Sequence, residues 1–96
     1  MGRALAAAIG VASIAAAVVA SAEPPAGAAA CSGCHPTSVR VTSPVPRLTG
    51  LDRAVIVKAM QDFRSGQRIA TVMDRIAKGF TDAEIQAIAV WYATQR

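Results

Sequence analysis

Both cysteines of the chain and its only histidine fall within one short motif, Cys31-Ser32-Gly33-Cys34-His35. Thiols at this spacing can add to the two vinyl groups of a haem, and the adjacent imidazole can then ligate the iron. This is the signature of covalent haem attachment. The sequence therefore predicts one haem c, bound covalently through Cys31 and Cys34, with His35 as an axial ligand of the iron.

Three other chemistries use cysteines at this spacing. A structural zinc site needs four ligands, and the chain has no further Cys or His to add to these three. A thioredoxin-like redox pair needs a βαβ setting, and no alternating strand pattern is visible. A plain disulfide would close a very short loop and stabilise little. Haem attachment is the preferred interpretation.

The second axial ligand is less well determined by the residues alone. Ligation by two histidines of the same chain is excluded, because His35 is the only one. Beyond the N-terminal leader the candidate donors are Met60 and Met73. Both lie in apolar helical patterns where core packing is the ordinary role, so spacing favours Met73 only modestly. A sixth position without Met stays open.

The first residues read as an export signal. Arg3 is followed by an apolar run from Ala4 to Ala20, and Ala20-Ser21-Ala22 fits the small-x-small rule for cleavage. We predict a signal peptide over residues 1–22 and one monohaem domain over 23–96, located in the periplasm. A retained membrane anchor is the alternative, since the run is about long enough to span a bilayer.

A domain as short as residues 23–96 rarely builds a sufficient core unaided and usually needs a disulfide, a metal or another staple. A buried haem would supply the missing apolar partner. Without Arg3 the domain has nine Lys/Arg against six Asp/Glu, so it is modestly basic. It lacks the clustered basic and aromatic residues of nucleic-acid-binding proteins. We expect neither nucleic acid nor, after cleavage, a membrane as a partner.

The expected elements before residue 66 are two helices joined by a loop. Residues 23–30 become helical at their alanine end, and the prolines of 36–50 prevent a continuous helix there. A helix over 51–64 is ended by Ser65-Gly66. Its apolar residues recur at helical spacing and define the expected buried face: Leu51, Val55, Ala59 and Phe63.

The rest of the chain also has helical patterns only. Residues 68–78 form a short, irregular helical stretch closed by Gly79. The run Thr81-Asp82-Ala83-Glu84 is a capping box, and it opens a last helix that extends to about Thr94. The buried face of that helix is expected to hold Ile85, Ile88, Ala89 and Tyr92. The predicted fold class is all-α.

Taken together, these motifs resemble the class I cytochromes c. The similarity rests on the CxxCH motif, the run Pro46-Arg47-Leu48-Thr49-Gly50, a later methionine and a last helix with Trp91-Tyr92. Within the class, residues 60–66 and 69–81 are similar to the cytochrome subunit of flavocytochrome c sulfide dehydrogenase. The resemblance implies short helices wrapped around one covalent haem, with Met73 as the distal iron ligand.

Two features depart from that family. Its best-known members carry two such domains and two haems, whereas this chain has a single haem motif. The Gly-Pro that often opens the haem loop is replaced by Ser43-Pro44. We therefore expect the carbonyl that accepts the His35 ring N–H to be that of Pro44 or one of its neighbours.

The expected function is electron transfer, with no catalytic residue. An iron ligated by both His and Met has no open position for a substrate, and methionine raises its potential. The resemblance implies an FAD-containing sulfide dehydrogenase subunit as the partner, with electrons passing on to a soluble acceptor. The alternatives are a free monohaem shuttle for an oxidase or another dehydrogenase, and a five-coordinate haem that binds a gas or peroxide.

The loop over 36–50 is more apolar than a solvated loop requires. It contains more prolines and valines than one haem edge can cover, so we expect some of these side chains to face a partner protein. Arg40 and Arg47 would form the polar rim of that docking surface.

Overall fold

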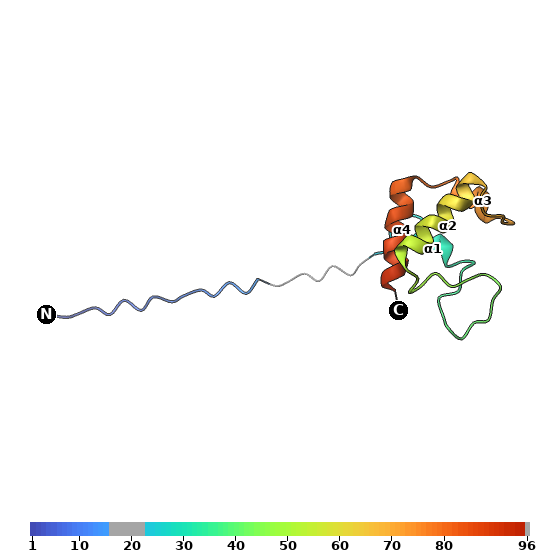
Figure 1. Cartoon of the computed structure of the whole chain (residues 1–96). Helices are drawn as coiled ribbons and strands as arrows, with labels where there is room; N and C mark the ends of the chain where they lie inside the picture. The colour runs from blue at the N-terminus through green and yellow to red at the C-terminus, as the bar shows by residue number, and fades with distance from the viewer. Residues whose placement is uncertain (16–22, 96) are drawn as a thin grey trace.

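The computed structural model describes residues 1–15 and 23–95, and in that part of the chain every regular element is a helix. Residues 1–15 form no helix or strand and lie apart from the helices (Figure 1). None of the described helices is long and apolar enough to cross a membrane. The cleavage site expected at Ala20-Ser21-Ala22 lies outside the described residues.

Four helices make up the folded body: α1 (Ala28–Cys31), α2 (Arg53–Ser65), α3 (Met73–Ala77) and α4 (Asp82–Thr94). Helix α2 packs against both α3 and α4 (Figure 1). The fully buried side chains come from all four helices: Ala28, Ile56, Met60, Ala77, Ile85, Ile88, Ala89 and Tyr92. The all-α prediction is confirmed for the described residues.

Helix α4 follows its sequence pattern closely. The Thr81 hydroxyl accepts a hydrogen bond from the Glu84 N–H at 3.2 Å, and the Glu84 carboxylate accepts one from the Thr81 N–H at 2.9 Å. This reciprocal pair is the capping box that the sequence predicts. The four residues expected on the buried face of the helix are the four that are buried.

Helix α2 differs from its prediction in both its start and its buried face. It begins at Arg53, because the Asp52 carboxylate caps it by accepting from the Ala54 N–H at 2.8 Å. The buried residues are Ile56 and Met60, whereas Val55 is 55% exposed. Val55 and Ile56 are adjacent, and each belongs to a set of apolar residues that recurs every four positions. Periodicity alone therefore could not show which of the two sets is buried.

The segment expected to be helical over 68–78 is helical only at Met73–Ala77. Residues 67–72 form bends instead, and Ile69 is 97% exposed. Met73 is half-buried, but Ile69, Val72 and Ile76 are all exposed, so this segment presents no continuous buried apolar face. Before it, Gly66 ends α2 in a left-handed conformation with φ +81°, as the sequence predicts.

Candidate functional site

The haem-attachment motif lies at the end of α1. Cys31 is the last residue of this helix, and the chain then turns so that the N–H groups of Cys34 and His35 both donate to the Cys31 carbonyl, at 3.2 and 2.9 Å. Cys31 is half-buried against the core, whereas Cys34 is exposed. Both thiols are free. The turn therefore brings the two expected attachment cysteines and the expected iron ligand His35 to one end of α1.

The two thiols differ in their surroundings. The Cys31 Sγ donates a weak hydrogen bond to the Gly27 carbonyl at 3.5 Å. Burial raises the pKa of the Cys31 thiol above its ordinary value, and hydrogen bonding of the sulfur lowers it by less. Before any attachment, Cys31 is thus the more protected of the two thiols and Cys34 the more accessible.

Helix α1 is too short to be stable alone, and two contacts fix its position. Gly27, just before it, has φ +85°, and a Cβ at this position would overlap the Phe80 ring. The buried Tyr92 hydroxyl donates to the Ala28 carbonyl. The cysteines are thereby held against α4 and against the chain segment just before it.

The His35 ring is oriented by the loop that follows it. Its Nδ1 lies 2.5 Å from the Pro46 carbonyl oxygen. Because a carbonyl oxygen can only accept, Nδ1 carries the proton and donates it. The other ring nitrogen, Nε2, is then the unprotonated one and is available as a metal ligand. This is the second-sphere arrangement that an iron-ligating histidine requires.

The acceptor is Pro46, two residues beyond the expected Pro44. The Ser43 hydroxyl accepts from the Val45 N–H at 3.1 Å, which makes a local turn around Pro44. Further along, Gly50 has φ +77° and its N–H donates to the Tyr92 carbonyl at 3.0 Å. The loop is thus tied to α4 just after Pro46. The expectation of a neighbour of Pro44 is borne out, but the carbonyl of Pro44 itself is not used.

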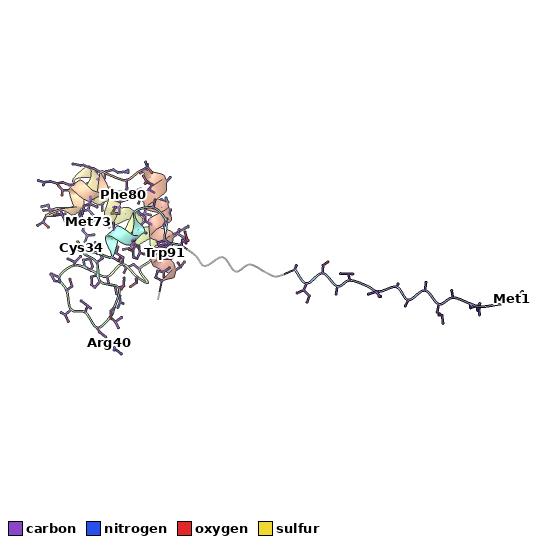
Figure 2. All side chains as sticks on the ribbon, turned by 180° about the vertical axis from the view of Figure 1, so that it is seen from behind. Met1, Cys34, Arg40, Met73, Phe80 and Trp91 are labelled. Carbon is purple, nitrogen blue, oxygen red and sulfur yellow. The ribbon has the colours of Figure 1, made fainter. Side chains whose placement is uncertain are left out.

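The two candidate methionines occupy different environments. Met60 is only 9% exposed and belongs to the core between α2 and its neighbours. Met73 is half-buried at the first position of α3, at the edge of the same core. Figure 2 shows Met73 and Cys34 on the same side of the helices. Met60 has the surroundings of a packing residue, and Met73 has those of a side chain that is partly free to ligate.

The residues present fit a haem. Two thiols could attach the haem, and the unprotonated Nε2 of His35 and the thioether of Met73 are the kinds of donor that ligate haem iron. Partly buried apolar side chains packed against the core could contact the macrocycle: Leu48, Val57, Phe63, Phe80 and Trp91. Within residues 1–15 and 23–95, no three His, Cys, Asp or Glu side chains are grouped so as to hold a metal ion by themselves.

Sequence reasoning missed Gly27 and the hydroxyl of Tyr92 as residues that position the motif. Tyr92 was predicted to be buried, and a buried phenol needs a hydrogen-bond acceptor, which is a usable signal. Gly27 falls in the segment 23–30, for which the sequence predicts only that the alanine end is helical. Its role depends on the distant Phe80 ring, so no local pattern could have revealed it.

Comparison with models of known protein families gives no match. Individual relatives are similar, however. The cytochrome subunit of sulfide dehydrogenase from Chlorobaculum tepidum is 42% identical over 62 residues, which cover 65% of this chain and 56% of the relative. Cytochrome c-554(548) from Halomonas halodenitrificans is 33% identical over 69 residues, which cover 68% of this chain and 83% of the relative.

A third relative, the thiosulfate dehydrogenase electron acceptor of Stutzerimonas stutzeri, is 38% identical over 64 residues. This match covers 65% of the present chain and 30% of the relative. The chain therefore spans about half the length of the sulfide dehydrogenase subunit and less than a third of the thiosulfate dehydrogenase acceptor.

Proposed function

The chain belongs to the cytochrome c family, and we propose that it is an exported monohaem electron-transfer protein that accepts electrons from a partner dehydrogenase. Membership of the family implies haem c as the cofactor. The expected all-α cytochrome c fold agrees with the helical structure of the described residues. The finer assignments that follow are proposals, and each has its own support.

The observation that carries the proposal is the hydrogen bond from His35 to Pro46. A histidine in a CxxCH motif has one ring nitrogen for the iron, and the other must be held in a fixed tautomer. The Pro46 carbonyl does this at 2.5 Å. In the proposed site, Cys31 and Cys34 would hold one haem covalently, and His35 and Met73 would ligate its iron.

The haem, when bound, supplies a one-electron couple. The protein supplies the rest. Helix α1 fixes the attachment points, the loop after His35 orients the imidazole, and the half-buried Met73 completes the ligand set. Two strong-field ligands from the chain leave no position for a substrate, so the site transfers electrons without catalysing a reaction of its own.

The partner we propose is an FAD-containing dehydrogenase that oxidises sulfide. Two relatives bear names that link them to sulfide and thiosulfate dehydrogenases. This chain has no free thiol after attachment of the haem, and thus nothing of its own for the sulfur chemistry. In the proposed scheme the flavoprotein oxidises sulfide, and single electrons leave through this haem to a soluble acceptor.

A free monohaem shuttle is the second candidate. The observation in its favour is the match to cytochrome c-554(548), which covers 83% of that relative and so includes most of a small cytochrome. In this case the protein serves an oxidase or another dehydrogenase without a permanent complex.

Co-expression distinguishes the two candidates. The chain is produced with its N-terminal residues together with the flavoprotein subunit of a sulfide dehydrogenase. A complex that contains both haem and flavin, and whose haem is reduced on addition of sulfide, is the expected result. A cytochrome that remains monomeric on sizing chromatography even at low salt would replace the sulfide proposal with the free shuttle.

A further inference from the structure

One side chain joins the two ends of the stretch that carries Met73. We call residues 66–81 the Met73 segment; they leave α2, run through α3 and return to the start of α4 (Figure 1). Arg64 lies in the last turn of α2, just before this segment. Its Nη2 donates to the Phe80 carbonyl, and its Nη1 donates to the Asp82 carboxylate at 2.5 Å. Arg64 therefore clamps the segment where it begins and where it ends.

The backbone provides no second tie of this kind. In the part of the chain that the structure describes, the other hydrogen bonds of residues 66–79 stay within the Met73 segment or reach the end of α2. The remaining support is apolar, because Ala77 is buried in the core and Met73 packs against it. A segment with so few ties opens locally more easily than the whole body unfolds.

The contacts of Arg64 are suited to oppose such a local opening. Its side chain is 30% exposed, and its hydrogen bond to the Phe80 carbonyl is partly buried. A charged donor makes such a bond stronger than a neutral donor does. The ion pair with Asp82 contributes less, because the Asp82 side chain is 78% exposed and water screens it. Both contacts must break when the Met73 segment moves away from α2 and α4.

The same clamp reaches the attachment motif through Phe80. Arg64 holds the backbone of Phe80, and the Phe80 ring lies so close to Gly27 that a Cβ on this glycine would overlap it. Gly27 directly precedes α1, whose last residue is Cys31. One guanidinium thus connects the segment of the expected distal ligand with the helix that ends at the first expected attachment cysteine.

We propose that Arg64 is a positioning residue for the sixth ligand: it keeps the Met73 segment closed and so keeps the Met73 thioether at the iron. This inference rests on the proposed function and deepens it, because it names the residue on which persistent ligation by Met73 depends. Breaking the clamp should raise the fraction of molecules in which Met73 has left the iron.

Imidazole in its neutral form is the probe for this fraction. It binds a ferric haem iron only where the sixth position is free, so its apparent Kd is inversely proportional to the fraction of open molecules. The haem-loaded, exported protein is titrated with imidazole, and loss of the sulfur-to-iron charge-transfer band reports binding. Arg64→Gln should lower the apparent Kd on the order of three- to tenfold.

Two variants separate the clamp from the effect of charge. Lys58→Gln removes the same charge from α2 but breaks an ion pair with Asp62 that lies within this helix, so the Kd should stay close to that of the wild type. Asp82→Asn removes the opposite charge and breaks part of the clamp, so it should also lower the Kd. A Kd that falls in Arg64→Gln and rises in Asp82→Asn would show an effect of charge alone and would overturn the inference.

A third variant separates local opening from global stability. Ile88 is a buried residue of α4, 3% exposed, and takes no part in the clamp. Ile88→Val should lower the denaturant midpoint by leaving a small cavity. It should not lower the Kd for imidazole, since the core stays folded when only the Met73 segment opens. Equal decreases of Kd in Ile88→Val and Arg64→Gln would mean that imidazole binds through global unfolding, and this too would overturn the inference.

The inference and the proposed function fail in different ways. A wild-type ferric protein without the charge-transfer band would contradict the proposed ligation and, with it, the inference. A wild-type protein that has the band, together with an Arg64→Gln variant that behaves like Lys58→Gln, would overturn the inference alone. If Arg64→Gln carries too little haem for a titration, Asp82→Asn decides by itself: a lowered Kd supports the clamp, and an unchanged or raised Kd contradicts it.

Discussion

The junction of α1 with α4 and the two segments beside the expected iron ligands, 36–50 and 67–78, use their apolar side chains in opposite ways. At the junction, Ala28, Ala89 and Tyr92 are almost completely covered by other parts of the chain. In the two segments, Val39 and Ile69 are mostly exposed. The chain itself covers the apolar side chains of the junction, whereas it leaves those of the two segments uncovered. The difference separates a scaffold that fixes the attachment motif from the segments beside the proposed haem.

The largest expected effect comes from removing the attachment points. Cys31→Ala combined with Cys34→Ala should abolish covalent haem and leave mostly unfolded protein, because the small core loses its main apolar partner. Intact mass and circular dichroism measure the two consequences. Survival of a cooperatively melting apoprotein would mean that the α1–α4 junction is sufficient on its own, and would remove the stabilising role that we assign to the haem.

The two methionines provide the next contrast. Met73→Ala should abolish the sulfur-to-iron charge-transfer band of the ferric protein and lower its reduction potential. Met60→Ala should keep the band but destabilise the protein by about 2–5 kcal/mol, because it leaves a cavity in the core. The reverse pattern would make Met60 the ligand. Optical spectra and denaturant titrations distinguish the outcomes.

Two glycines test how rigidly α1 is held. Both Gly27 and Gly66 have positive φ, but only at Gly27 would a Cβ meet another side chain, the ring of Phe80. Gly66→Ala should lower the free energy of unfolding by about 1–2 kcal/mol, because alanine is strained in the left-handed conformation. Gly27→Ala should lower it by about 1–3 kcal/mol more, because its Cβ would also overlap the Phe80 ring. Equal losses in denaturant titrations would mean that Phe80 simply moves away and does not fix α1.

The Tyr92 hydroxyl tests the same junction with less disturbance. Tyr92→Phe keeps the ring but leaves the Ala28 carbonyl without its hydrogen-bond donor. The free energy of unfolding, measured by denaturant titration, should fall by about 1–3 kcal/mol.

The same hydroxyl gives a pH-dependent test. Burial raises the pKa of the Tyr92 phenol above its ordinary value of 10.0. The folded state therefore favours the neutral phenol. The contribution of Tyr92 to the free energy of unfolding is fully present below pH 10 and is lost as the pH rises through the pKa of the folded state. Tyr92→Phe should flatten the alkaline end of the stability profile, and an unchanged profile would contradict this origin.

The smallest effect is expected at the start of α4. Hydrogen bonds from Thr81 lower the pKa of Glu84 below its ordinary value of 4.5. Its stabilising contribution is therefore present above that value and is lost as the pH falls through the lower folded pKa. Glu84→Gln keeps an acceptor for the Thr81 N–H but cannot titrate. Thermal melts between neutral and acidic pH should show a weaker acid dependence in the variant, and identical curves would argue against the effect.

Local patterns allowed much of the scaffold to be predicted. The capping box and the buried face of α4 follow directly from residues adjacent in sequence. The apolar face of α2 was predicted only in part: Phe63 packs against the core, but Val55 is exposed. The buried residues are Ile56 and Met60, which have the same four-residue spacing as the predicted set. The short, irregular helix expected over 68–78 exists only as Met73–Ala77, so its start was placed too early.

The candidate site divides in a similar way. The haem motif and its histidine are contiguous, so the sequence alone identifies them. The acceptor of the His35 proton depends on how the loop over 43–50 turns and where Gly50 is tied to α4, and these are three-dimensional facts. The anchoring of α1 by Phe80 and Tyr92 joins residues far apart in the chain, so no local pattern could reveal it.

The central claim is that one haem, ligated by His35 and Met73, moves single electrons. A potentiometric titration of the purified, exported protein, followed by its optical spectrum, tests this most directly. The account predicts a single one-electron transition between low-spin states, with the sulfur-to-iron charge-transfer band present in the ferric form and absent after Met73→Ala. A high-spin ferric protein that lacks this band and binds added ligands at its iron would contradict it.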